Sequence, residues 1–389
     1  MTNYIFYDDV LEQRAGGPST YLYNLKKGLD KIDTNIIHFI CRKQNSKVVN
    51  SESKIKKILY KTPFLYERFF IKRRQQISGI YEQLNRVKLN DTVMFHMTTD
   101  FTKSLKLLPK SCTKVLMSHS PEITSYQIVN DLKNRTGKPN YKFNYARKKY
   151  YEKFDLPAFK NADILVFPSK EAMEPYYETC DNFEKIIKDK KIKFLPTGTE
   201  KLEFKMSKSK FRKKYRIPDN AFVLTFIGRH NHVKGYDIFI EICKSLINKY
   251  DDCYIVTAGV GDIKSYNHER WIDIGWTNDP GSVANAADIF VLPNRRTYFD
   301  LVLIEMLSIG KTCLVSNTGG NKTMATYSKG IITYDSIEDA INKIIYMYLN
   351  RDCLKKYSKL NENAYIENFT PEIFSQRYIN LMREIENEK

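Results

Sequence analysis

Two loops of this 389-residue sequence combine cationic side chains, glycine and a helix start in a way that suits a phosphate or diphosphate. The first, residues 228–235, follows an apolar run and contains Arg229 and Lys234. The second, residues 293–300, ends where an apolar run of helical length begins. Lysine and arginine bind phosphate oxygens directly, and the unpaired N–H groups at a helix start favour an anion. The two loops therefore predict an anion site made of cations and backbone donors.

The second loop lies inside a strand-loop-helix pattern. Residues 289–292 form a short apolar run typical of a buried strand, and residues 301–309 form an apolar run long enough for a helix. Asp300 precedes that helix as a candidate N-cap, and Gly310 follows it as a terminator. Glu305 lies one turn into the helix, so we expect it within reach of the same ligand.

Two apolar runs in the first half of the chain end in histidine, at His96 and His119. In an open parallel sheet the ligand crevice lies at the carboxyl ends of the strands, where both histidines would fall, with Glu122 close by. Gly16 and Gly17 separate a first strand from a first amphipathic helix, so a ligand can approach the backbone there. A plain turn explains these glycines equally well.

Strands and helices alternate twice along the chain, with a charged linker at residues 201–216 between the two halves. This pattern predicts an α/β fold with two doubly wound, Rossmann-like domains that face each other across a central cleft. We expect the domains to span residues 1–200 and 201–370. A last helix is predicted in residues 371–389, packing back onto the first domain.

The net charge of +18 is concentrated in one half of the chain. Residues 1–200 carry 36 Lys and Arg against 22 Asp and Glu, whereas residues 201–389 carry 27 against 23. A nucleic acid, an anionic membrane or a phosphorylated ligand would each be attracted to such a field. The basic residues do not form one continuous stripe and no recognition motif is present, so no nucleic-acid partner is expected.

Basic and aromatic residues are mixed at 54–60, 64–74 and 141–151, as in helices that lie on an anionic bilayer. An ordinary amphipathic helix with a basic face is the alternative.

No apolar run reaches 18 residues, and no basic, apolar leader opens the chain. Seven scattered cysteines without a CxxC pair indicate reduced thiols and no zinc site. We therefore expect a cytoplasmic protein, peripheral on the inner face of the plasma membrane.

Over nearly its whole length, the chain resembles the GT-B-fold retaining glycosyltransferases of family 4, the glycosyl transferases group 1. The resemblance is carried by five segments, namely Gly16-Gly17, Leu195-Pro196-Thr197-Gly198, Gly228-Arg229 with Lys234-Gly235, Gly275-Trp276, and Phe299-Asp300-Leu301 with Glu305. The last is the most specific because it sits in the expected strand-loop-helix context.

Two positions depart from the family signature. Thr297 stands where the family has a first glutamate, and Asp300 where it has a glycine. In the family that first acid contacts hydroxyls of the donor sugar, and the second, here Glu305, contacts the ribose. The departure at Thr297 makes an atypical or deoxy sugar a reasonable hypothesis, since fewer hydroxyls would need an acceptor.

The resemblance implies catalytic roles for four residues. Arg229 and Lys234 would neutralise the leaving diphosphate, Glu305 would hold the ribose, and His119 would lie beside the donor sugar. The implied donor-binding residues are Gly16, Gly17, Gly228, Trp276, Thr297, Phe299, Asp300 and Leu301. His96 and Glu122 are candidates for the acceptor side. No cofactor and no metal is expected, because no DxD motif is placed to hold Mg²⁺.

The implied activity is transfer of a sugar, with retention, from a nucleotide-sugar donor to a glycan or lipid-linked glycan in cell-surface polysaccharide biosynthesis. In that arrangement the first domain is the acceptor side, and the second binds the nucleotide sugar. One alternative keeps the transferase but gives it a protein or soluble small-molecule acceptor. Another is a catalytically silent protein that binds nucleotide or glycan, and a third is a nucleic-acid-binding protein.

Overall fold

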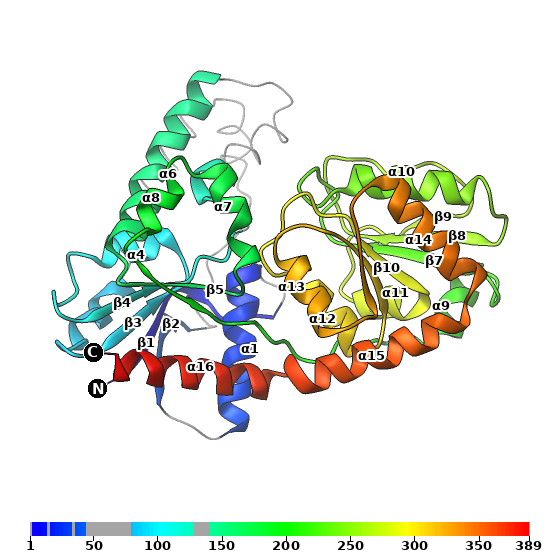
Figure 1. The fold of residues 1–389 in the computed structure, drawn as a ribbon. Helices are drawn as coiled ribbons and strands as arrows, with labels where there is room; N and C mark the ends of the chain where they lie inside the picture. The colour runs from blue at the N-terminus through cyan, green and yellow to red at the C-terminus, as the bar shows by residue number, and fades with distance from the viewer. Residues whose placement is uncertain are drawn as a thin grey trace. The chain divides into compact units, whose positions relative to one another are not determined.

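The computed structural model describes residues 2–13, 16–32, 36–43, 79–120, 122–127 and 141–388 (Figure 1). The basic segments 54–60 and 64–74 lie outside these residues. Of the segment 141–151 the structure gives the helix, α6 (Tyr141–Asn161), with few of its side chains. In the described part of the chain, no helix is both long enough and apolar enough to cross a bilayer.

The chain divides into two compact units, each with one six-stranded sheet. The first comprises Met1–Phe167, Tyr176–Leu195 and Gln376–Lys389. The second comprises Pro168–Pro175 and Pro196–Ser375. All strand pairs of the described residues are parallel, which confirms the predicted α/β fold with two Rossmann-like halves. The sequence analysis placed a single boundary at residue 200. In the structure the second unit also includes the short segment Pro168–Pro175.

The sheet of the first unit has the order β2-β1-β3-β4-β5-β6. Its strands are β1 (Asn3–Val10), β2 (Ile37–Arg42), β3 (Thr92–Phe95), β4 (Thr113–Leu116), β5 (Ile164–Phe167) and β6 (Lys191–Phe194). Its other elements are α1 (Gly17–Lys31), η1 (Gly79–Arg86), α4 (Thr98–Ser104), α6, the end of α7 (Glu174–Thr179) and α8 (Phe183–Ile187). Every residue of β3 and β5 is buried, as expected for short apolar runs in a parallel sheet.

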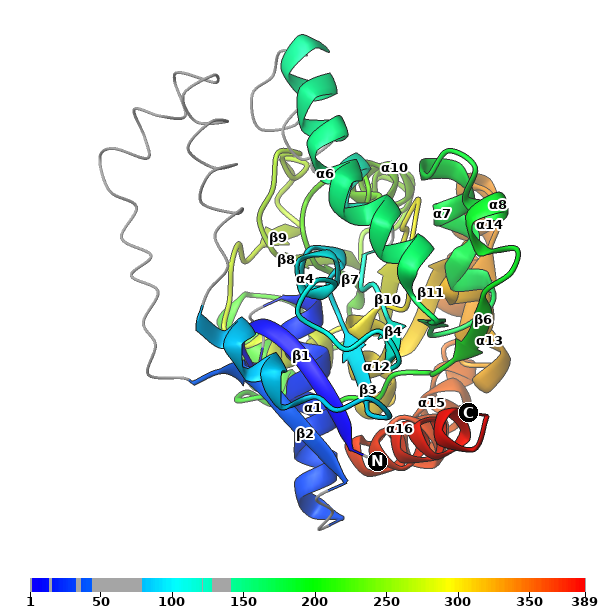
Figure 2. The same cartoon turned by 90° about the vertical axis from the view of Figure 1, so that its left-hand side faces the viewer.

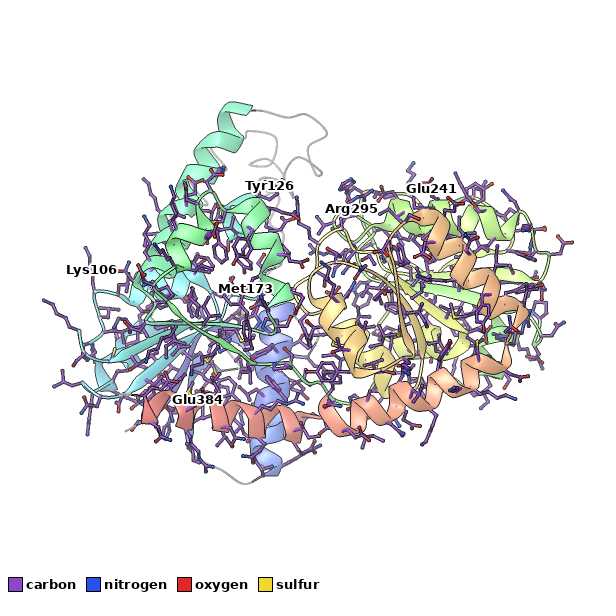
Figure 3. All side chains as sticks on the ribbon, viewed as in Figure 1. Lys106, Tyr126, Met173, Glu241, Arg295 and Glu384 are labelled. Atoms are coloured by element: carbon purple, nitrogen blue, oxygen red, sulfur yellow. The ribbon has the colours of Figure 1, made fainter. Side chains whose placement is uncertain are left out.

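The C-terminal helix α16 (Pro371–Asn387) packs along this first sheet (Figures 1 and 2). Its Glu384, labelled in Figure 3, accepts a hydrogen bond of 2.6 Å from Lys193 on the edge strand β6. The Tyr378 hydroxyl lies 2.7 Å from the sulfur of Met94 in β3. Asn3 Nδ2 donates to Glu386 at 3.0 Å, so the two ends of the chain lie close together in this unit.

The sheet of the second unit has the order β12-β11-β10-β7-β8-β9. Its strands are β7 (Phe222–Ile227), β8 (Cys253–Ala258), β9 (Trp271–Asp273), β10 (Ile289–Leu292), β11 (Thr312–Ser316) and β12 (Ile331–Tyr334). Its helices are η2 (Glu171–Met173), α9 (Lys208–Lys214), α10 (Tyr236–Ile247), α11 (Pro280–Ala286), α12 (Leu301–Ser308), α13 (Gly320–Tyr327), α14 (Ile337–Leu349) and α15 (Asp352–Asn368). The helices cover both faces, and apolar side chains of α10 and α14 pack on one of them.

Candidate active site

The strand order of the second sheet reverses between β7 and β10. Ligands of open parallel sheets bind at the carboxyl ends of the strands at such a switch point. The loop that follows β7 is residues 228–235, and the loop that follows β10 is residues 293–300. The topology therefore brings together the two loops that the sequence singled out for a phosphate.

These two loops are locked to each other. Gly235 has a φ of +65°, and a Cβ there would lie 1.8 Å from the carbonyl oxygen of Pro293. The Arg295 N–H donates to the Val233 carbonyl at 3.0 Å. The Arg295 guanidinium, labelled in Figure 3, makes two hydrogen bonds of 2.7 Å to the carboxylate of Asp237. A bidentate pair of this kind fixes geometry, so the loops form one rigid surface.

Lys234 does not stand alone in this surface. Its ammonium lies 2.7 Å from Asp300 Oδ1, and the other carboxylate oxygen of Asp300 accepts a hydrogen bond from Asn294 Nδ2. Asp300 takes the predicted N-cap position of α12, but its side chain makes no capping hydrogen bond. The carboxylate goes to Lys234 instead, and the first turn of α12 has no capping side chain from Asp300. An uncapped helix start of this kind can receive an anion.

The other predicted donor-binding side chains of this unit take different positions. Arg229 is exposed, and Leu301 and Glu305 are partly exposed on α12. Phe299 is buried, so its side chain is not available to a ligand at the surface. Trp276 is 75% exposed, which leaves its indole face free to stack on a planar group.

Three glycines bring neighbouring loops into contact at this end of the sheet. Gly228, with φ +157°, follows β7, and a Cβ on Gly259 after β8 would lie 1.8 Å from the Gly228 carbonyl oxygen. The Gly259 N–H donates in turn to the Gly275 carbonyl after β9, at 2.8 Å. The loop that carries Trp276 is thus connected to the loop that carries Arg229.

Thr297 is packed inward, with 1% of its surface exposed. Within the described residues, its hydroxyl has no hydrogen-bond partner. Its carbonyl oxygen faces the next loop, since a Cβ on Gly319 would lie 2.2 Å away and the Gly320 N–H donates to it at 3.4 Å. Thr297 therefore shapes the loop and presents no side chain to a ligand in this structure.

The first sheet also has a switch point, between β1 and β3. The glycine loop follows β1 and leads into α1, whose N-cap is Gly16 with a φ of +121°. A Cβ at Gly16 or Gly17 would meet no atom of the described residues within 4 Å, so these residues leave the space beside both glycines open. The positive φ accounts for glycine at position 16, whereas the open space at both positions permits the close approach of a ligand.

The two predicted histidines meet at the same switch point. His96 Nδ1 lies 2.7 Å from His119 Nε2. The ring of Tyr21, from α1, lies 4.3 Å from that of His119 and 5.4 Å from that of His96. Desolvation lowers the pKa of His119 to about 3 and also lowers the pKa of His96, so both rings are neutral near pH 7.

The acceptor-side candidates are not surface groups. His96 is 0% exposed and Glu122 is 1% exposed, whereas His119 is partly exposed. His96 is thus farther from the surface than His119. Because Glu122 is buried, the structure does not support a direct contact between Glu122 and an acceptor. Across the described ranges, no three His, Cys, Asp or Glu side chains gather to hold a metal ion. Independence from metal stays a prediction.

Three residues of these sites were not identified from the sequence. Arg295 and Asp237 pair across 58 residues of sequence, and Tyr21 contacts histidines 75 and 98 residues away. Arg295 could have been identified from its position in the loop after β10, because that loop had already been assigned to the site. Nothing local marks Tyr21, whose helical spacing reads as ordinary core.

Residues 207–367 match the family described as glycosyl transferases group 1. One similar protein is the UDP-Gal:alpha-D-GlcNAc-diphosphoundecaprenol alpha-1,3-galactosyltransferase of Escherichia coli, 30% identical over 40% of this chain and 44% of its own. Another is the O-antigen biosynthesis glycosyltransferase WclY of Escherichia coli, 24% identical over 57% of this chain and 63% of its own. The chain thus spans about half the length of these relatives.

Two solved structures share the fold over the whole chain. Sucrose-phosphate synthase from Thermosynechococcus elongatus has a TM-score of 0.64 at 14% identity and covers 100% of both chains. Anabaena HepE in complex with UDP and glucose has a TM-score of 0.59 at 11% identity, over 98% of this chain and 99% of its own. Residues 207–367 thus match the glycosyl transferases group 1 family, in a chain that has the GT-B fold.

Proposed function

We propose that this chain is a glycosyltransferase that moves a sugar from a nucleotide-sugar donor to a glycan or lipid-linked glycan in cell-surface polysaccharide biosynthesis. One observation carries the proposal. Lys234 and the start of α12 meet at the switch point of the second sheet, inside the matched domain. The names of the similar Escherichia coli proteins support the class of acceptor.

Breaking the bond between a sugar and a nucleoside diphosphate places negative charge on the leaving phosphate. Lys234, Arg229 and the N–H groups at the start of α12 would stabilise that charge. Glu305 would accept hydrogen bonds from the ribose, and Trp276 would stack on the base. On the resemblance to retaining enzymes, we propose that the anomeric configuration is kept and that no metal is needed.

The donor is proposed to be a UDP-sugar, because a similar protein is named for UDP-Gal and a protein of the same fold binds UDP. Thr297 offers no acceptor for sugar hydroxyls, since its side chain is packed inward. A sugar with fewer hydroxyls on that side, such as a deoxy sugar, fits this arrangement.

A donor panel tests the proposal. The purified chain is incubated with UDP-galactose, UDP-glucose, UDP-N-acetylglucosamine and nucleotide-activated deoxy sugars, with and without EDTA. The acceptors are a GlcNAc-diphospholipid, a soluble sugar and a peptide. We expect UDP release coupled to product with the lipid-linked acceptor, unchanged by EDTA. Binding of UDP without turnover of any donor would favour the silent alternative, and product with the peptide or soluble sugar would favour the other acceptors.

We also propose that the protein is cytoplasmic and associates peripherally with the inner face of the plasma membrane. The positive surplus of residues 1–200 supports this, because an anionic bilayer attracts such a charge. Sedimentation with vesicles of phosphatidylglycerol and phosphatidylcholine should show binding at low salt that decreases at high salt. Equal sedimentation with pure phosphatidylcholine, or none with either, would refute it.

A further inference from the structure

The hydrogen bond between His96 and His119 requires that one ring donate and the other accept. The two nitrogens are 2.7 Å apart, within the usual range for a hydrogen bond. A neutral imidazole carries one N–H and one bare nitrogen. Both rings are neutral, so each has a single N–H. Whichever ring donates the shared proton therefore fixes the tautomer of both rings.

The surroundings of His96 favour one direction. Its outer nitrogen, Nε2, is buried and has no hydrogen-bond partner within the described residues. If His119 were the donor, His96 would have to carry its own proton on Nε2, as a buried N–H without an acceptor. Buried N–H groups of that kind are rarer in folded proteins than buried acceptors without a donor. If His96 donates from Nδ1, its buried Nε2 is only a bare acceptor.

The rings are also held in place. Tyr21 lies against both histidines, and its hydroxyl lies 3.2 Å from the sulfur of Met117. The ring planes of His96 and His119 are inclined by 19° to each other, with centroids 5.0 Å apart. His119 is therefore held on one side by Tyr21 and at one nitrogen by His96, and its Nδ1 is the remaining polar atom of the ring.

We propose that His96 is a positioning residue that keeps His119 in the Nδ1–H tautomer, so that His119 presents a fixed, neutral N–H donor to its substrate. In this form His119 cannot take a proton at Nδ1, and its Nε2 is engaged by His96. It therefore serves to donate a hydrogen bond to a substrate oxygen and does not act as a general base. The proposal rests on the proposed function, because it assumes that His119 contacts the substrate.

The tautomer can be measured without any assay of activity. The full chain is labelled with ¹⁵N-histidine, and the ring nitrogens are assigned by single replacement of the six histidines. We expect a protonated-type shift for His119 Nδ1 and a bare-type shift for His119 Nε2, unchanged from pH 6 to pH 8. A protonated His119 Nε2 in the folded protein would overturn the proposal.

Two variants of matched size test the direction of the bond. In His96→Asn the amide can donate from near the position of Nδ1, whereas in His96→Asp the carboxylate can only accept. We expect the Asn variant to keep kcat within about tenfold of wild type and the Asp variant to lose about 10- to 100-fold more. UDP affinity should be unchanged in both, since neither substitution alters Arg229, Lys234, Glu305 or Trp276, which are proposed to hold the nucleotide. Equal activity of the two variants would contradict the proposal.

Folding and function can be separated from the proposed role. If the Asp variant fails to fold, the ¹⁵N spectrum of the Asn variant tests the proposal instead. His119 of that variant should keep the wild-type tautomer. A shift of His119 to the other tautomer in the folded Asn variant would overturn the proposal. If the wild-type protein transfers no sugar, the proposed function fails, and the spectrum still reports whether His96 fixes the tautomer.

Discussion

Replacing Lys234 with alanine is expected to lower kcat/KM for the nucleotide sugar by about 100- to 1,000-fold, the range typical for loss of one charge-stabilising donor. The ammonium lies at the loop junction, 2.7 Å from Asp300 and next to the start of α12. Its loss removes a cation and also leaves the Asp300 carboxylate without its cationic partner, so that the carboxylate would repel the leaving diphosphate. Initial rates of UDP release coupled to product formation measure the effect.

A control lysine and a second substitution separate these two contributions. Lys343 in α14 also lies 2.7 Å from a carboxylate, that of Asp339, and is only partly exposed, so Lys343→Ala should leave the rate unchanged. Adding Asp300→Asn to Lys234→Ala should recover about tenfold if repulsion contributes. A folded Lys234→Ala protein with a rate within about threefold of wild type would refute the assignment of Lys234.

Local patterns were sufficient to predict the sheets and to place the loops at residues 228–235 and 293–300 after strands of the second sheet. Parallel strands bury both faces, so their apolar runs stand out, and glycine marks the loops where backbones approach closely. The same reasoning made Arg229 and Lys234 candidates for the site, because cations beside glycine directly after a strand are a local signal.

The errors came from contacts between residues far apart in sequence. Asp300 is an ordinary N-cap by position, but its partner Lys234 lies 66 residues earlier and draws the carboxylate away. Glu122 follows a strand end in sequence, yet the fold buries it. His96 and His119 were both placed at strand ends, and only the pairing of their strands shows that one lies behind the other. Burial depends on neighbouring strands and helices, which a single sequence does not specify.

The second large effect is expected on stability, at Arg212. This side chain is 1% exposed and reaches the carboxylate of Asp288 at 3.0 Å, as well as the carbonyl oxygens of Asp219, Ala221 and Ala286. Arg212→Met should lower the free energy of unfolding by about 3–5 kcal/mol, because it leaves a mostly buried carboxylate without its buried cationic partner. Urea unfolding followed by tryptophan fluorescence measures this in the second unit, where both tryptophans, Trp271 and Trp276, lie.

Lys208 provides a matched control. It also pairs with Asp288, at 2.7 Å, but it is exposed, so Lys208→Met should cost only about 0–1 kcal/mol. Equal losses in the two variants would show that burial of Arg212 is not the source of its effect.

The pH dependence follows from Asp288. Burial acts to raise the pKa of its carboxyl, but Lys208, Arg212 and the Val223 N–H outweigh burial and hold the pKa below its ordinary value. A carboxyl with a lowered folded pKa stabilises the protein above its unfolded pKa of about 3.9, and that contribution is lost as the pH falls through the folded value. The difference between wild type and Arg212→Met should therefore narrow from pH 7 to pH 3. A difference that stays constant would assign the effect to the backbone carbonyls alone.

Arg212 also connects stability to the proposed site. Asp288 Oδ2 accepts a hydrogen bond from the Val223 N–H, and the Asp288 N–H donates to the Val223 carbonyl, both at 2.8 Å. These bonds join the beginnings of β7 and β10, the two strands whose far ends carry residues 228–235 and 293–300. The proposed function requires that those loops keep a fixed spacing to hold a diphosphate. Arg212→Met should therefore also weaken UDP binding at temperatures where the variant is still folded, whereas Lys208→Met should not. UDP titration of both variants at 25 °C measures this, and unchanged affinity in Arg212→Met would show that the loops keep their spacing without the buried ion pair.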